Sequence, residues 1–299
     1  MKVEAKNSRG RVRKFAAWSV LLLGAALLAA APGKSRPAAE WPKEIRIGII
    51  PETGVLKTND PFLLFGQYLS RQLKVPVQIE ARESYLSLIT SCRDQSLEVA
   101  YIGPYAYVEM AEIGRVEPLV MELDTQGRRG YQSLLIARRD SGFTKVEDGR
   151  GKVLAFCDPN STSGFFIPML HFVSDLGVTP ASFASEVVFA GGHGLVVKGV
   201  AEGRYAIGAT NDVDLPRALA ELGLKPEDFR VLWTSQMIPG SLYCARRDLP
   251  ASLKQALGEA MINLKDKAVL SPLKIGGLAL TQDADYEIIR ELKKVQREP

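Results

Sequence analysis

The stretch VLAFCDPNSTSGFFIPMLHFV, residues 153–173, contains the clearest change of pattern in the chain. Its apolar run Val153–Phe156 is typical of a buried strand, and the apolar residues from Phe165 onward predict a helix. Between them lies the polar loop Asp158–Gly164, with three consecutive hydroxyl residues and a glycine. A strand, a loop and a helix in this order form the repeating unit of an α/β protein.

The same alternation extends over most of the chain from Glu44 onward. Expected strands cover Ile45–Ile50, Val77–Ala81, Leu97–Ile102, Val153–Phe156, Val187–Phe189 and Tyr205–Ala209. Expected helices cover Phe62–Leu73, Tyr85–Cys92, Tyr105–Ile113, Phe165–Leu176, Leu195–Ala201 and Leu215–Leu222, followed by two at about 251–269 and 283–296. This order predicts an α/β architecture with largely parallel sheets.

Two strand-like segments end in the same four residues, Ala-Arg-Arg-Asp. They are Leu134–Asp140 (LLIARRD) and Leu242–Asp248 (LYCARRD), and they flank the second group of strands and helices. A two-lobed protein needs two connections, one into the inserted lobe and one out of it. We therefore expect one lobe from residues 44–132 plus 243–299 and a second lobe from residues 133–242.

The basic residues are concentrated at the start of the chain. The 299 residues include 38 Lys and Arg and 34 Asp and Glu, which gives a net charge of +4. Residues 1–31 hold one acidic residue and six basic ones: Lys2, Lys6, Arg9, Arg11, Arg13 and Lys14. The remainder carries a net charge of −1, so the overall basicity does not argue for a nucleic-acid partner.

A 17-residue apolar run, Phe15–Ala31, follows these basic residues and ends in three alanines before Pro32. This layout predicts that residues 1–31 are a secretory signal peptide, with an uncleaved N-terminal membrane anchor as the alternative. No later stretch is long and apolar enough to span a bilayer. We expect an exported protein that is soluble once it is released.

The three cysteines, Cys92, Cys157 and Cys244, match no metal-ligand spacing. One disulfide is possible in an exported protein, but the sequence does not choose the partners. We favour three small buried side chains. No lysine follows Gly164, so the polar loop is not a nucleotide-binding P-loop, and we expect neither a metal nor a cofactor.

The loop Asp158–Gly164 has the composition of an anion site. The N–H groups of a first helical turn lack intrahelical partners, the helix dipole is positive there, and the hydroxyls of Ser161, Thr162 and Ser163 add donors. Ordinary capping of the helix is the alternative, since Ser, Thr and Asn are preferred caps. A cap needs only one hydroxyl, so three in a row favour the anion site.

Other candidate donors lie at the ends of expected strands or the starts of segments. His193 stands among glycines (GGHG) after the strand Val187–Phe189, where open α/β sheets bind ligands. Tyr85 and Tyr131 each open a segment at an expected lobe edge, and a tyrosine hydroxyl can donate to an oxyanion. His171 falls inside an expected helix and is predicted to be packed.

Taken together, these motifs resemble the phosphate-, phosphite- and phosphonate-type periplasmic substrate-binding proteins of ABC transporters. The resemblance rests on DPNSTSG with the following Pro168, the GGH loop, and Ile238-Pro239-Gly240, and it is supported by Ser84-Tyr85, Gly103-Pro104 and Gly130–Ser133. It implies a type II periplasmic-binding fold whose two lobes close on an oxyanion, a periplasmic location, a permease partner and a monomer. It also implies that the three hydroxyls of the loop hold the phosphoryl oxygens, helped by Tyr85, Tyr131 and His193.

The sequence departs from this family where aminoalkylphosphonate-binding members hold the ligand's amine with acidic residues. After the Pro-Gly pair stands Ser241, and near Asp214 the chain reads Asn-Asp-Val-Asp with Val213 at the expected acidic position. We therefore expect phosphate, phosphite or a simple phosphonate, with Ser241 as a donor and Asp212 as a further ligand-binding candidate.

Two other functions remain as alternatives. An exported oxyanion sensor would present its ligand-bound form to a membrane receptor kinase instead of a permease. An enzyme would pair the thiol of Cys157 with the imidazole of His193. No residue that would orient the histidine can be named, and Cys157 ends an apolar strand, so catalysis is disfavoured.

Overall fold

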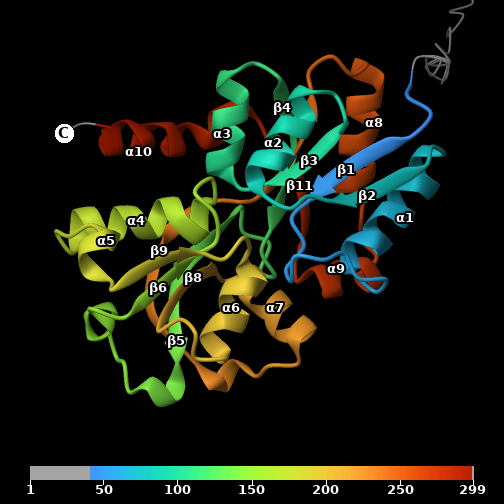
Figure 1. Cartoon of the computed structure of the whole chain (residues 1–299). Helices are drawn as coiled ribbons and strands as arrows, with labels where there is room; N and C mark the ends of the chain where they lie inside the picture. The colour runs from blue at the N-terminus through green and yellow to red at the C-terminus, as the bar shows by residue number, and fades with distance from the viewer. Residues whose placement is uncertain (1–40, 298–299) are drawn as a thin grey trace, which may run out of the picture. The chain divides into compact units, whose positions relative to one another are not determined.

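The computed structural model describes residues 41–297, so the signal-peptide prediction for residues 1–31 lies outside the described residues. The described strands form two sheets (Figure 1). The first sheet has the order β11-β4-β10-β3-β1-β2 and the second β7-β6-β8-β5-β9. The first comprises β1 Ile45–Ile49, β2 Val77–Ala81, β3 Val99–Ile102, β4 Val116–Leu123, β10 Leu242–Arg246 and β11 Gly277–Leu280. The second comprises β5 Gly130–Arg138, β6 Val153–Phe156, β7 Glu186–Phe189, β8 Ile207–Asn211 and β9 Phe229–Pro239.

Each sheet has its own helices, which gives the two-lobed α/β fold expected from the sequence. Against the first sheet and its helices pack α1 Pro61–Leu73, α2 Tyr85–Arg93, α3 Pro104–Glu112, α8 Ala251–Ile262, α9 Lys267–Leu273 and α10 Glu287–Arg297. Against the second pack α4 Ile167–Leu170, α5 Pro180–Phe183, α6 His193–Ala201 and α7 Asp214–Leu222. Across residues 41–297, no helix is both long enough and apolar enough to cross a membrane.

The expectation of largely parallel sheets is wrong. The strand β1 pairs parallel with β2 and β3, and β6 pairs parallel with β7 and β8. The strand β10 runs antiparallel to β3 and β4, and β5 runs antiparallel to β8 and β9. Both β5 and β10 are the first strand after the chain crosses from the other sheet. Each therefore runs antiparallel to a neighbouring strand that belongs to a β-α-β unit. The sequence analysis also did not anticipate β4, β9 and β11.

The chain passes from the first sheet to the second between Leu123 and Gly130 and returns between Pro239 and Leu242. The two Ala-Arg-Arg-Asp segments, residues 137–140 and 245–248, span the ends of β5 and β10, which are the first strands after these passages. Lobe boundaries at residues 132/133 and 242/243 stay a prediction.

The strand patterns explain how the cores are divided. In β5, Leu135 packs on one face with Phe156 and Phe172, whereas Leu134 and Ile136 pack on the other face with helices α6 and α7. This division follows from the alternation of side chains along a strand. The largest buried cluster lies around the first sheet, which carries the completely buried side chains of β1.

The single helices expected at 165–176 and 251–269 are both interrupted. In the first, α4 is flanked by π-helical segments at Thr162–Phe166 and His171–Asp175. Pro168 has no N–H to donate to the carbonyl of Gly164, and that carbonyl instead accepts a 2.9 Å bond from Cys157 N. In the second, α8 ends at Ile262, and Asp266 caps a new helix, α9.

A buried arginine connects the two sheets. Arg217 on α7 lies 2.9 Å from Glu122 at the end of β4 and 2.8 Å from Asp214 on its own helix. Its Nε donates to the carbonyl of Leu273 on α9. The Arg217 side chain is 3% exposed and that of Glu122 5%, so removing either partner leaves a buried charge without its counter-charge.

We expect Arg217→Met to lower the free energy of unfolding by about 3–5 kcal/mol, the usual cost of breaking a buried ion pair from one side. Urea unfolding followed by circular dichroism measures it. The matched control is Arg204→Met, which removes an exposed pair with Glu202 and should leave the midpoint unchanged. Equal midpoints for the two variants would show that Arg217 does not hold the sheets together.

Candidate functional site

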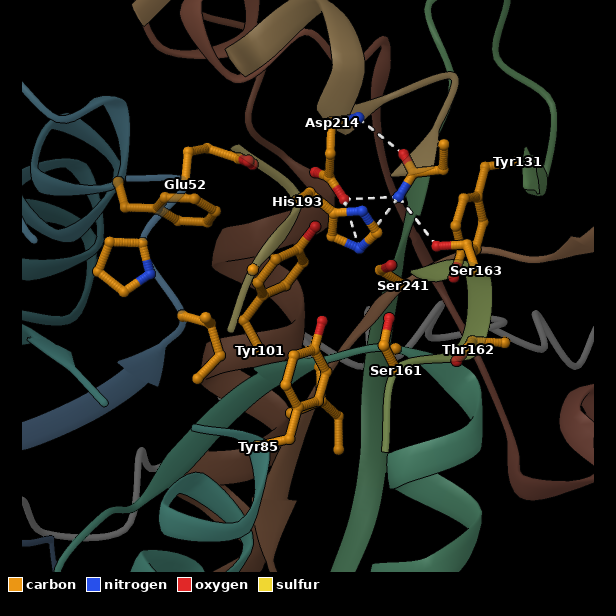
Figure 2. A pocket seen from close by; sticks show the side chains of 17 residues that line it. Glu52, Tyr85, Tyr101, Tyr131, Ser161, Thr162, Ser163, His193, Asp214 and Ser241 are labelled. Atoms are coloured by element: carbon orange, nitrogen blue, oxygen red, sulfur yellow. Dashed lines mark hydrogen bonds and ion pairs between the residues drawn. The ribbon is translucent and has the colours of Figure 1, made fainter. Parts of the chain in front are cut away.

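A small polar cavity lies where the carboxyl ends of strands from both sheets meet the first turns of several helices (Figure 2). The space open to the centres of water molecules is about 40 Å³, enough for roughly three waters. Its wall consists of Ile50, Pro51, Glu52, Phe62, Tyr85, Tyr101, Ile102, Gly103, Tyr131, Ser161, Thr162, Ser163, Gly192, His193, Asn211, Asp214 and Ser241. Seven of the eight residues predicted to bind ligand are among them; Asp212 is not.

The loop that follows β6 contributes three hydroxyl groups to this wall. The Oγ of Ser161 accepts a 3.0 Å bond from Gly164 N, the Oγ1 of Thr162 accepts a 2.8 Å bond from Tyr105 N, and the Oγ of Ser163 accepts a 3.0 Å bond from Asn211 Nδ2. Each hydroxyl oxygen is therefore occupied as an acceptor by a protein N–H group. A hydroxyl has one proton to give, so these contacts leave all three groups able to donate to an anion.

Capping and anion binding are thus compatible in this loop. Ser161 is the N-cap of the turn Thr162–Phe166, yet Thr162 and Ser163, which do not cap, are 1% and 2% exposed beside the same cavity. Gly103 closes on the loop so tightly that an added Cβ would stand 2.8 Å from Thr162 Oγ1.

Two tyrosines complete this side of the cavity. Tyr85 is the first residue of α2 and lies beside Ser161 in the cavity wall, and Tyr131 near the start of β5 lies beside the side chains of Ser163, Ser241 and Thr162. Burial raises the pKa of both phenols above the usual tyrosine range. Both hydroxyls therefore keep their protons at neutral pH and remain donors.

His193 opens helix α6 and lines the cavity. Its Nδ1 lies 3.2 Å from the hydroxyl of Thr210 and 3.2 Å from the thiol of Cys157. Burial lowers the pKa of His193 even though Asp214 acts in the opposite direction, so the ring is neutral at pH 7. Because Nδ1 faces a hydroxyl that can donate to it, the ring proton is placed on Nε2, on the side of Asn211 and Asp214.

The pair of Cys157 and His193 proposed for the enzyme alternative is thus in contact, but the thiol has the wrong environment for a nucleophile. Cys157 is fully buried and its Sγ also lies 3.4 Å from the carbonyl of Ala209. Burial raises the pKa of Cys157 well above that of a free cysteine, and nearby carboxylates act in the same direction. Reactive cysteines have a lowered pKa and an accessible sulfur. Cys92 and Cys244 are also free and buried, as expected.

Two carboxyl groups in the cavity wall, Glu52 and Asp214, were missed by the sequence analysis. Asp214 accepts a 2.6 Å bond from Asn211 Nδ2, and the carboxyl of Glu52 points toward Asp214 (Figure 2). The sequence analysis assigned the acidic position to Val213, whose side chain is buried. The acidic side chain in the cavity is that of the next residue, Asp214.

Asp212 lies elsewhere. Its Oδ1 accepts a 2.8 Å bond from Gln132 N, so its carboxylate joins the end of β8 to β5. The strand β8 ends at Asn211, one residue before Asp212. The position of this strand end decides the direction in which the side chain of Asp212 points. This hydrogen bond gives the carboxylate of Asp212 a structural role that requires no ligand.

No lysine or arginine belongs to the cavity wall as the described residues form it. The charge of Arg217 acts on His193 in this wall, but its guanidinium is already paired with Glu122 and Asp214. An anion in this cavity would be held by neutral hydroxyl, amide and imidazole donors and by helix starts, as in other anion sites built from backbone dipoles.

Residues 47–286 match the family model described as ABC transporter, phosphonate, periplasmic substrate-binding protein. The chain is 27% identical over 303 residues to the phosphate-import protein PhnD of Mycolicibacterium smegmatis, which covers 93% of each protein. It is 25% identical over 263 residues to the phosphonates-binding periplasmic protein of Escherichia coli, which covers 85% of this chain and 77% of that protein.

A crystal structure of a binding protein component of an ABC phosphonate transporter from Pseudomonas aeruginosa has a similar fold. The TM-score is 0.79 at 24% sequence identity, with 85% of this chain and 86% of that chain covered. This likeness supports the two-lobed architecture.

Burial and the raised pKa of Cys157 predict that this thiol reacts slowly with a maleimide or disulfide reagent at neutral pH. The measurement is labelling of the native protein followed by mass spectrometry, with a urea-unfolded sample in which all three cysteines should react. Rapid labelling of Cys157 in the native protein, prevented by an added ligand, would contradict this and favour the enzyme alternative.

Proposed function

The chain belongs to the family of periplasmic substrate-binding proteins of phosphonate ABC transporters, and from this we propose that it captures a compact phosphorus oxyanion in the cavity of Figure 2. Phosphate, phosphite and simple phosphonates form the proposed ligand class. The observation that carries this proposal is the set of three adjacent hydroxyls, Ser161, Thr162 and Ser163. Each accepts an N–H from the protein and keeps its own proton for a ligand.

The size of the cavity supports a compact ligand. Space for about three waters fits one tetrahedral oxyanion with a small substituent, not a nucleotide. We call the loop Asp158–Gly164 the serine loop. In the proposed complex, Tyr85, Tyr131, His193 and Ser241 donate from the walls around its three hydroxyls. Asp212 has no part in it, because its carboxylate already accepts from Gln132 N.

The cavity draws residues from both sheets, and this supports closure driven by the ligand. Glu52, Tyr85 and Gly103 lie in segments that connect strands of the first sheet. The serine loop, His193 and Asp214 lie in segments that connect strands of the second. With lobes at residues 44–132 plus 243–299 and 133–242, a ligand would contact both lobes only in the closed state. Such differential affinity shifts the population toward that state.

The proposed partner is the permease of the ABC transporter, with the protein acting as a monomer in the periplasm after export. Presentation of the closed form to a membrane receptor kinase is the alternative output of the same binding event. Reconstitution with an ABC permease complex of the phosphonate type distinguishes them. Stimulation of its ATPase activity by the ligand-bound protein supports transport, and stimulation of a receptor kinase instead overturns it.

A thermal-shift panel of phosphate, phosphite, methylphosphonate, 2-aminoethylphosphonate and sulfate tests the ligand class. At about 100-fold over its dissociation constant, a true ligand adds about 2.7 kcal/mol to the stability of the native state. We expect at least one phosphorus oxyanion to raise the melting temperature. If none does so, the assignment of the cavity is wrong.

The double variant Ser161→Ala/Ser163→Ala tests the serine loop itself. Two lost hydrogen bonds to a charged ligand should weaken binding about 100-fold or more, as measured by calorimetry. Thr179→Ala is a matched control, because Thr179 also caps a helix but is exposed and outside the cavity. Unchanged affinity in the double variant would remove the loop from the binding site.

A further inference from the structure

The helix α3 is capped at its first turn by a residue of the serine loop. Gly103, the N-cap of α3, has no side chain to cap the helix, and Pro104 has no N–H group. The first N–H group of α3 is therefore that of Tyr105, and it donates a 2.8 Å bond to Thr162 Oγ1. In most helices the side chain of the N-cap residue accepts such a bond. Here Thr162, 57 residues further along the chain, takes that role.

The same residue of α3 makes a second contact with the turn that begins at Thr162. The ring of Tyr105 stacks on that of Phe166, with 4.4 Å between the ring centroids and 13° between the ring planes. Phe166 is fully buried and is the last residue of this turn. Tyr105 therefore holds the turn Thr162–Phe166 at both ends, through its backbone N–H and through its ring.

Gly103 leaves the space that this approach needs. Its φ of −76° is accessible to any residue, so the backbone conformation does not require a glycine here. An added Cβ, however, would stand 2.8 Å from Thr162 Oγ1. A side chain at position 103 is thus excluded only while α3 and the serine loop lie against each other.

These contacts join the two sheets with their helices. The helix α3 connects β3 to β4 in the first sheet, whereas the turn Thr162–Phe166 follows β6 of the second. With the lobes proposed above, separation of the lobes takes Thr162 away from Tyr105 N. The hydrogen bond and the ring stack therefore belong to the closed state.

Resting on the function proposed above, we propose that Tyr105 is a positioning residue that couples ligand capture to lobe closure through the hydroxyl of Thr162. That hydroxyl accepts from Tyr105 N and donates its own proton to the bound oxyanion. The anion makes the hydroxyl oxygen a stronger acceptor, since hydrogen bonds in a chain polarise one another. The ligand thus strengthens a contact that belongs to the closed state, and this is the differential affinity that closure requires. Tyr105 itself lies outside the cavity wall formed by the described residues.

The variant Gly103→Ser should favour the open state over the closed one. The extended backbone of Gly103 suits a serine N-cap, so the new hydroxyl can cap α3 within its own lobe, while its Cβ stands in the way of Thr162. The melting temperature without ligand should therefore stay the same or rise. Each of phosphate, phosphite and methylphosphonate that the unaltered protein binds should bind about 10- to 100-fold more weakly, the usual effect of overpacking, as measured by calorimetry.

The matched control is Gly258→Ser in α8, where the atom nearest to an added Cβ is 3.6 Å away on the side chain of Leu280. This change should leave affinity as it is. Unchanged affinity in Gly103→Ser, or a lower melting temperature of that variant without ligand, would overturn the coupling while leaving the proposed function intact. Failure of the unaltered protein to bind any of the three anions would overturn the function and the coupling with it.

The variant Tyr105→Leu tests the coupling from outside the cavity. It keeps the backbone N–H and removes the ring that stacks on Phe166, so the closed state loses one of its two contacts. Stopped-flow measurements should show the bound anion dissociating about 2- to 10-fold faster, with little change in the association rate. Phe189→Leu is the control, because it removes ring contacts with Phe156 and Phe165 among the elements of the second sheet alone. Equal dissociation rates in these two variants would overturn the proposal.

Discussion

The bond from Cys157 N to the carbonyl of Gly164 determines the shape of the serine loop. Pro168 cannot donate to that carbonyl, so the strand end takes it instead, and residues 158–164 are folded back against β6. An added Cβ at Gly164 would stand 2.3 Å from Cys157 Sγ, which leaves no room for any other residue. The same closure places three hydroxyls in a row on the wall of the cavity. The contact between β6 and the loop thus packs the loop and also positions the hydroxyls that we propose bind the ligand.

The proposed site binds an anion without a basic side chain in the cavity wall formed by the described residues. The donors in its wall are neutral, and the nearby guanidinium of Arg217 is already paired with Glu122 and Asp214. Such preorganised dipoles hold an anion without the large desolvation cost of a free buried cation. They also depend on geometry more than on charge, which suits a protein that must tell one small oxyanion from another.

The sequence was sufficient for the parts of the site that are local in the chain. Ser161, Thr162 and Ser163 lie between one strand and one helix, and His193 follows another strand, so the pattern alone places them at strand ends. Glu52 and Asp214 could not be paired in this way, because they lie far apart in the chain and meet only across the two sheets. Asp212 and Asp214 differ by two positions, and only the observed end of β8 decides which of them enters the cavity. The antiparallel strands were missed because their direction depends on the passages between sheets, which leave no local pattern.

The central claim is that neutral donors of the serine loop hold the oxyanion. A crystal structure of the protein with methylphosphonate tests it most directly. The account predicts that two phosphoryl oxygens lie within hydrogen-bond distance of the hydroxyls of Ser161, Thr162 and Ser163, with no lysine or arginine in contact. A phosphorus atom bound at a basic side chain, or outside this cavity, would contradict it.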